Sequence, residues 1–346
     1  LSLASLWNSP RGRALLYQGA LVVGVIALFY ATVQTVATNV ARQGVKTGFG
    51  FLGREAGFAI NQSLIPYSHE STYAAAIFVA FLNTLLLAGL TIALCTVFGL
   101  LLAFARMSSN WLLSMLAHLY VELFRNVPLL LQLFFWYNAA LRMLPGKRES
   151  IDFFEIAFLN IEGLFIPVPE LHEGAAAVVW AAVGAIAAAI AVHVLARRRQ
   201  ARSGQPFPSA LAGLAIIIVV PVLVAWTLGF PITWDVPHFE RFNFVGGMVL
   251  QPEFVAMVLG LTLYNTAFVG EIVRAGVQSV PKGQREAARS IGLGELQIYR
   301  EIIVPQAKRL ILPPLTNQYL NLTKATALAA AIGYPELLWA LGGAIQ

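Results

Sequence analysis

The stretch that decides the fold of this chain is residues 281–292, Pro-Lys-Gly-Gln-Arg-Glu-Ala-Ala-Arg-Ser-Ile-Gly, which lies between two strongly apolar segments. Pro281 suits the first turn of a helix, where its missing N–H has no partner to lose, and Gly292 suits the helix stop. The pattern predicts a short helix over residues 281–291. Four residues at helical spacing share one small, mildly apolar face: Gln284, Ala287, Ala288 and Ile291. Such a helix either lies in a groove of a partner or is an ordinary solvated loop helix, and spacing alone leaves both open.

The composition of the chain indicates a membrane protein. Charged residues make up 12% of the 346 residues and hydrophobic residues 58%, and the mean hydropathy is +0.72. Soluble domains carry about 25% charged residues, so these charges are too few to cover a soluble surface. The formal net charge of +6 is then explained by basic loops at the inner membrane face. We therefore expect membrane lipid around the chain and no nucleic-acid partner.

A membrane-spanning helix needs about 20 mostly apolar residues, and seven apolar segments of the chain have that length. They are residues 14–36, 74–105, 111–144, 174–195, 207–229, 253–275 and 303–333. No long period-two alternation indicates a membrane barrel, so we expect an all-α integral membrane protein, a polytopic helix bundle. With the N-terminus in the cytoplasm, about twice as many basic residues fall in inner loops as in outer segments, which favours that orientation.

Other segments carry motifs that go with residues 281–292. The chain continues to Ile302-Ile303-Val304-Pro305, and residues 271–279 read Glu-Ile-Val-Arg-Ala-Gly-Val-Gln-Ser. Residues 121–132 read Val-Glu-Leu-Phe-Arg-Asn-Val-Pro-Leu-Leu-Leu-Gln. Together these segments resemble the "EAA" loop and flanking helices of bacterial ABC importer permeases of the polar amino acid family. The resemblance covers about residues 74–346 and is greatest to a permease subunit of the general L-amino acid importers.

The resemblance implies the type I ABC importer permease fold and a multi-pass protein of the bacterial inner membrane. It divides the chain into an N-terminal membrane helix with an outer segment, residues 1–73, and a permease domain, residues 74–346. Two extra helices and outer segments are inserted at about residues 145–252. The family usually has one more helix after the seventh, so we expect about seven membrane helices here and an eighth missing at the C-terminus.

The resemblance also implies a function and a set of partners. The chain would form half of the translocation pathway of an ATP-driven amino acid importer. Its partners would be a second permease subunit, with a related but different chain expected, a cytosolic ABC ATPase dimer and a periplasmic amino acid binding protein. The residues implied in ATPase coupling are Pro281, Gly283, Gln284, Glu286, Ala287, Ala288, Ile291 and Gly292.

ATP chemistry is expected outside this chain. The sequence contains no G-x-x-x-x-G-K-[S/T] phosphate loop, and its nearest dipeptide, Gly146-Lys147, is followed by Arg148. We therefore expect no enzymatic activity and no bound cofactor in this chain, with ATP and Mg²⁺ held by the ATPase. The five histidines and the single cysteine lack metal-ligand spacing, so no metal site is expected.

Several charged and amide side chains fall inside the apolar segments, where they are costly unless paired or facing a wet path. Glu122 with Arg125, and Glu271 with Arg274, lie three residues apart and can pair on one helix face. Such pairs either hold helices together or line the path of a zwitterionic amino acid, with Arg125 as the carboxylate contact. The candidate pathway residues are Glu122, Arg125, Asn126, Gln132, Glu271 and Lys324.

Other functions were weighed against a permease. An ion-coupled secondary amino acid transporter is the main alternative; such proteins often contain inverted repeats, and none is visible between the halves of this chain. A membrane enzyme would need a catalytic cluster, which the sequence does not offer. The aromatic residues of 230–252 suit either an interfacial belt or an outer docking surface.

Overall fold

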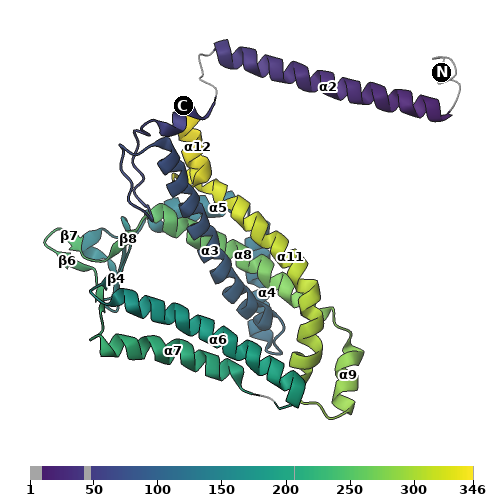
Figure 1. Cartoon of the computed structure of the whole chain (residues 1–346), viewed down its shortest axis with the longest axis vertical. Coiled ribbons are helices and arrows are strands. Elements are labelled where there is room, and N and C mark those ends of the chain that lie inside the picture. The colour runs from purple at the N-terminus through teal and green to yellow at the C-terminus, as the bar shows by residue number, and fades with distance from the viewer. Residues whose placement is uncertain (1–9, 43–47, 206, 346) are drawn as a thin grey trace. The chain divides into compact units, whose positions relative to one another are not determined.

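The computed structural model describes residues 10–42, 48–205 and 207–345 (Figure 1). The chain separates into two units. The first comprises Leu1–Gly57 with His69–Ala75, and the second comprises Phe58–Ser68 with Ala76–Gln346.

The first unit contains one long apolar helix, α2, Pro10–Arg42. Its core, Gly12–Val40, is long and apolar enough to cross a membrane. Three threonine hydroxyls donate to carbonyls one turn earlier within the helix, at 2.7–2.8 Å, so these polar groups are satisfied without a partner chain. A short 3₁₀ turn, Phe49–Gly53, follows in this unit.

The second unit is a helix bundle organised around α8, Pro252–Gln278. The other helices of the bundle are α3, Tyr73–Arg106; α4, Trp111–Asn126; α5, Leu129–Phe134; α11, Val304–Ala325; and α12, Leu337–Ile345. Small residues let the backbones approach closely. A Cβ added to Gly99 of α3 would lie 2.5 Å from Val269 of α8, and one added to Gly276 of α8 would lie 2.3 Å from Ile311 of α11. The helices α3 and α11 therefore pack tightly on α8.

A helical hairpin and a set of short strands occupy the predicted insert, residues 145–252. The helices α6, Ala175–Ser203, and α7, Ser209–Thr227, pack on each other (Figure 1). The strands β1, Ile151–Phe153; β2, Ala157–Asn160; β3, Gly163–Ile166; and β8, Met248–Leu250 form an antiparallel sheet in the order β1-β2-β3-β8. Two further pairs join β4, Val168–Leu171, to β5, Ile232–Asp235, and β6, His238–Glu240, to β7, Asn243–Val245.

The number of spans differs from the sequence prediction. Within the described residues, five helices are long and apolar enough to cross a membrane, or six if the bent pair Glu295–Ile332 and Leu337–Gly343 counts as one. The predicted span 111–144 is broken at Pro128 into α4, α5 and a π-helical turn, Phe135–Leu141. The helix α12 begins where the eighth helix was expected to follow. The helical membrane fold is confirmed, and the strands are an addition that the sequence analysis missed.

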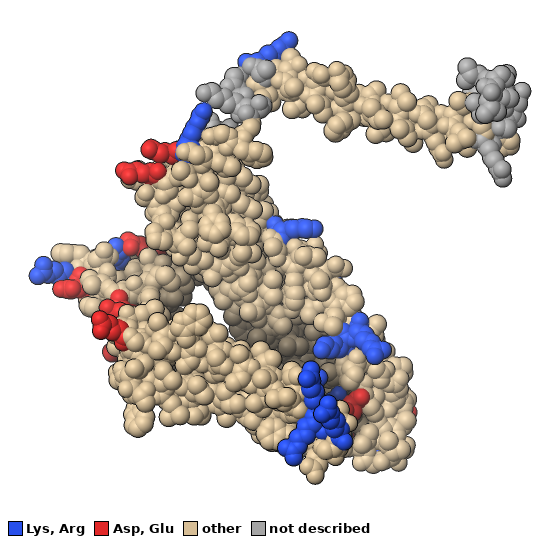
Figure 2. Space-filling model, viewed as in Figure 1, with Lys and Arg blue, Asp and Glu red and all other residues tan. Residues whose placement is uncertain are grey.

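Charge separates the two ends of the second unit (Figure 2). Lysines and arginines gather where α6 ends, and α9, Lys282–Ser290, carries three more, whereas acidic residues with a few basic ones lie over the strands. We call these the basic end and the strand end. Because α8 starts directly after β8 and leads into α9, it joins the strand end to the basic end.

Candidate functional site

The helix α9 forms where the sequence predicted it. It begins after Pro281 and runs from Lys282 to Ser290. It stops because Gly292 takes a left-handed conformation, φ 83°, which glycine adopts without the penalty of a side chain. The N–H of Gly292 donates to the carbonyl of Arg289 at 3.0 Å, and that of Leu293 to Ala288 at 3.2 Å, which completes the cap.

The four residues predicted to share one face of α9 divide between two environments. Ala288 is only 3% exposed and packs with Ile298 and Ile303 in a small core of its own chain. Gln284, Ala287 and Ile291 remain exposed. The prediction of a single presented face is therefore corrected: Ala288 anchors the helix, and its neighbours face outward.

Side chains of the following segment brace α9. Arg285 donates to the hydroxyl of Tyr299 at 3.0 Å and its guanidinium lies 5.0 Å from the centre of the same ring. Arg289 pairs with Glu295 of the short helix α10, Glu295–Ile298, at 2.5 Å. Gln306 of α11 donates to Gln284. The loop is thus one block with the start of α11.

Two large apolar side chains project from this block. Ile291 is 75% exposed and Leu296 is 82% exposed, in a loop that is otherwise rich in charge. Sequence reasoning named Ile291 and missed Leu296. The signal available was its position as an apolar residue in a polar loop, outside the helix that drew attention. The remaining predicted coupling residues, Gly283 and Glu286, are also exposed.

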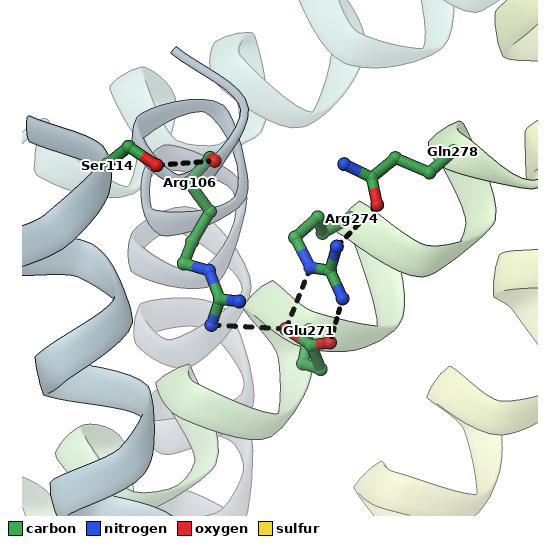
Figure 3. A network of polar contacts seen from close by, with 5 residues as sticks. All are labelled: Arg106, Ser114, Glu271, Arg274 and Gln278. Atoms are coloured by element: carbon green, nitrogen blue, oxygen red, sulfur yellow. Dashed lines mark hydrogen bonds and ion pairs between the residues drawn. The ribbon is translucent and has the colours of Figure 1, made fainter. Parts of the chain in front are cut away.

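The predicted pair Glu271–Arg274 forms, and it belongs to a larger cluster at the basic end of α8 (Figure 3). Arg274 donates through two nitrogens to both oxygens of Glu271, one bond being 3.0 Å long. Arg106, at the end of α3, approaches the same carboxylate at 3.4 Å. Ser114 of α4 donates to the carbonyl of Arg106 at 3.1 Å, and Arg274 also donates to Gln278. Glu271 therefore connects helix ends, as expected of a pair that holds helices together.

The predicted pair Glu122–Arg125 is not formed among the described residues. Asn126 donates to Glu122 at 3.2 Å, one turn away on α4, and this amide takes the place expected for the arginine. The guanidinium of Arg125 instead lies over the ring of Phe268 of α8, 5.3 Å from its centre. All three predicted pathway residues on α4 are exposed on this chain.

Gln132 has a structural task that the sequence analysis did not foresee. Pro128 interrupts the helix and leaves carbonyls without their usual donors. The buried amide of Gln132 donates to Phe124 O at 3.0 Å and to Val127 O at 2.9 Å, on both sides of the last turn of α4. The residue holds the break between α4 and α5 together, and its nitrogen is not free to contact a solute.

Lys324 lies in the last turn of α11 and is exposed, with no hydrogen bond or ion pair within the described part of the chain. Asn317 and Asn321 precede it at helical spacing and are exposed as well. These three residues form an exposed polar stripe along the second half of α11. Uncovered charge is costly at membrane depth, so this stripe is a candidate contact surface.

The fold and the site together define a class: a multi-pass membrane subunit whose braced loop helix projects from the basic end of a helix bundle. Residues 181–345 match the family described as binding-protein-dependent transport system inner membrane component. The chain is 45% identical to a putative amino-acid ABC transporter permease of Escherichia coli, over 97% of this chain and 86% of the relative. It is 45% identical to a general L-amino acid transport system permease of Rhizobium johnstonii, over 99% of this chain and 86% of the relative.

The structure is also similar to a solved amino acid ABC transporter with histidines. The match covers 77% of this chain and 76% of that chain, at 22% identity and a TM-score of 0.43. The sequence relatives decide the family: the chain belongs to the binding-protein-dependent transport system inner membrane components, and is a permease subunit of an ABC importer. The resemblance found in the sequence is thereby confirmed. The alternative of an ion-coupled secondary transporter is not favoured.

Proposed function

We propose that this chain carries amino acids across the membrane as one half of a pathway that an ATPase at its basic end drives. The observation that carries the proposal is the construction of the loop at 281–303, which is anchored inward by Ala288 and presents Ile291 and Leu296 outward. Large apolar side chains exposed on a braced, charged loop offer a contact to a protein partner. The relatives named as amino-acid permeases support the choice of solute.

The loop is connected so that a push on it reaches two membrane helices. Val277, in the last turn of α8, and Val280, just after the helix, pack against the core that holds Ala288. On the other side the loop continues into α11, to which Gln284 is also hydrogen-bonded. A closing ATPase that displaces α9 would therefore displace the ends of α8 and α11 together, because packed interiors move as blocks. ATP and Mg²⁺ would be held by that partner.

The pathway would lie along the polar faces that this chain leaves uncovered. Glu122, Arg125 and Asn126 on α4 and Lys324 on α11 are exposed polar groups on apolar helices. A second permease subunit, related to this chain, would cover them and leave a wet passage between the two. A guanidinium forks onto a carboxylate, so Arg125 would contact the acid group of the amino acid and Glu122 its ammonium group.

The remaining partners would bind at the two ends of the second unit. Basic residues favour the cytoplasmic side of a membrane, so the basic end would face the cytoplasm, with the N-terminus on the same side in the bacterial inner membrane. The strand end would face the periplasmic amino acid binding protein that delivers the solute. Acidic side chains gather on the strand side (Figure 2), with basic ones among them, and complementary charges on that protein would fit against them.

Reconstitution into liposomes tests both which solute is transported and whether ATP hydrolysis drives the transport. The chain is co-expressed with its neighbouring subunits, the purified assembly is identified by mass spectrometry, and uptake of each labelled L-amino acid into liposomes is measured with and without ATP. We expect ATP-dependent uptake that needs the binding protein. Uptake by this chain alone under a proton or sodium gradient would contradict the proposal.

Cross-linking tests the loop contact directly. The chain has a single cysteine, Cys95, which is buried, so an introduced cysteine is the one accessible thiol. In Ile291→Cys and Leu296→Cys we expect cross-links to the ATPase and protection from a soluble maleimide in the assembly. Phe242→Cys, between β6 and β7 on the strand side, is the control and should label freely in the assembly without its binding protein. Free labelling of both loop cysteines in an active assembly would show that the motor binds elsewhere.

A further inference from the structure

A small polar cavity lies at the strand end of the bundle, away from the loop and from the exposed faces of α4 and α11. It has a volume of about 180 Å³. Its lining comes from the start of α8, from the segment before α3 and from the turn between the 3₁₀ helix Thr326–Ile332 and α12. The polar and aromatic residues of the lining are Asn61, Gln62, Gln251, Glu253, Tyr334 and Trp339. Pockets for drug-sized ligands have about 300–1,000 Å³, so this one suits a smaller solute or one end of it.

The walls of the cavity are held by hydrogen bonds from α3. The amide of Asn83 donates to Gln62 O at 2.8 Å and to Pro335 O at 3.1 Å, and Asn83 is fully buried. The hydroxyl of Thr84 accepts from the N–H of Leu337 at 3.1 Å. Two segments far apart in the sequence, at Gln62 and at 335–337, are thus tied to one helix, and the cavity is formed before any ligand arrives.

One wall carries a carboxylate that is only half used. Glu253 Oε1 accepts a hydrogen bond from the hydroxyl of Tyr137 at 2.7 Å, and Arg142 in turn lies 3.4 Å from that hydroxyl. This fixes the carboxylate in place. No bond within the described part of the chain reaches its second oxygen, Oε2, and Glu253 lines the cavity. The cavity therefore has a fixed negative group available to a cation.

Buried polar atoms beside the cavity lack partners. Tyr334 is 0% exposed, and its hydroxyl has no hydrogen-bond partner in the described chain. The same holds for Gln62 Oε1 and Asn83 Oδ1, which are acceptors. Buried polar groups are rarely left unpaired. A carboxylate, unpaired acceptors and the rings of Tyr334 and Trp339 form an environment that favours a donor-rich cation such as an ammonium group.

We propose that this cavity is an outer binding site for the ammonium end of an α-amino acid, occupied before the solute reaches the faces of α4 and α11. The proposal rests on the proposed function, since it takes the transported solute as its ligand. Glu253 holds the ammonium group by charge, Gln62 and the hydroxyl of Tyr334 complete its hydrogen bonds, and Trp339 closes the site. The solute's carboxylate is not bound here, because no cation lines the cavity in the described chain.

The test measures binding to the assembled transporter in lipid nanodiscs without its binding protein. The probes are labelled L-alanine, L-glutamate and L-lysine, with ethylamine and propionate as competitors that carry only the amine or only the acid. We expect saturable binding of at least one probe, displaced by ethylamine and not by propionate. Glu253→Gln keeps an acceptor for Tyr137 and so preserves the fold, but should weaken binding about tenfold or more, because a hydrogen bond to a charged group is lost.

Tyr334→Phe is the cleanest variant because its hydroxyl bonds nothing in the described chain. It should leave the thermal midpoint unchanged and weaken binding about threefold. Glu240→Gln, on β6, is the matched control and should bind as the wild type does. Displacement by propionate alone, unchanged affinity in Glu253→Gln, or no saturable binding in an assembly that takes up amino acids would each overturn the site. Uptake by the wild-type assembly, measured in parallel, separates this failure from failure of the proposed function, in which uptake itself is absent.

Discussion

The charged side chains at the basic end of α8 are paired within the chain, whereas those on the polar face of α4 are not paired with an opposite charge in the part of the chain that the structure describes. Glu271 meets two arginines, Arg274 on its own helix and Arg106 on α3, so its charge is satisfied within the chain. On α4, the Glu122 carboxylate accepts one bond from the described residues, from the Asn126 amide, and Arg125 lies over an aromatic ring while staying exposed. Charge that the chain satisfies by itself maintains the fold, whereas charge that it leaves open is available to a solute or a second subunit.

The loop at 281–303 repeats this contrast with apolar groups. Ala288 is enclosed by its own chain, and Ile291, three residues on, is exposed. Ala288 lies in α9 and Ile291 caps its end, and the two were predicted to share one face. Their separation implies that substitutions at the enclosed position damage the loop itself, while those at open positions damage only what the loop contacts.

The largest effect is expected from Ala288→Asp. A carboxylate at this position would be buried against Ile298 and Ile303 without a partner, which costs several kcal/mol or opens the loop. We expect uptake to be abolished and the loop to become sensitive to limited proteolysis. Ala287→Asp, at the exposed neighbour, should also impair ATPase binding but leave the loop resistant to protease. Equal protease resistance in the two variants would remove the distinction between anchor and contact.

The next effect concerns the open charge of α4. Arg125→Gln should lower uptake at least about tenfold, since a charge-assisted contact of about 1.5–3 kcal/mol is lost. The thermal midpoint of the assembly should hardly change, because Arg125 pairs with no carboxylate within the described chain. Arg198→Gln, on the exposed end of α6, serves as the control for loss of one arginine. If uptake and ATPase activity both survive in Arg125→Gln, this face does not line the pathway.

The sequence predicted the bundle and the loop helix well because both depend on local patterns. Long apolar runs report membrane helices, and Pro281 with Gly292 reports the ends of α9. The same reasoning could not find the strands, which are only three or four residues long and give no sustained alternation. Their core is instead made by ring contacts across the fold, such as Phe165 with Phe244 at 4.5 Å.

The candidate pathway was harder to predict because a side chain's partner depends on tertiary geometry. Spacing correctly paired Glu271 with Arg274 and could not anticipate Arg106, which comes from another helix. It listed Gln132 as a pathway residue, whereas the break at Pro128 turns that amide toward backbone carbonyls. Polar groups in apolar segments are thus visible in a sequence, but whether the chain itself uses them is not.

A third, smaller effect is expected when the paired charge of α8 is removed. Glu271→Gln leaves Arg274 and Arg106 close together without their carboxylate, and we expect about 1–3 kcal/mol less stability, discounted for partial exposure. The loss should appear as a thermal midpoint lower by several degrees and as faster hydrogen exchange at the ends of α3 and α8. Glu301→Gln, whose pair with Arg300 is exposed, is the control and should change little. Unchanged exchange in Glu271→Gln would mean that the cluster does not hold these helix ends together.

The smallest effect is expected at the strand end, where an exposed aromatic residue has an unfavourable backbone conformation. Phe154 sits at the tip of the β1–β2 hairpin with φ 60° and is 91% exposed. A bulky residue pays for this left-handed conformation, while asparagine tolerates it. Phe154→Asn should therefore stabilise the hairpin by about 0.5–1 kcal/mol, measured as slower hydrogen exchange in β1 and β2. If the Phe154 ring contacts the binding protein, uptake driven by that protein falls even as the hairpin gains stability. Unchanged uptake would mean that the ring has no such partner. The contrast between satisfied and open groups would then not extend to the strand end.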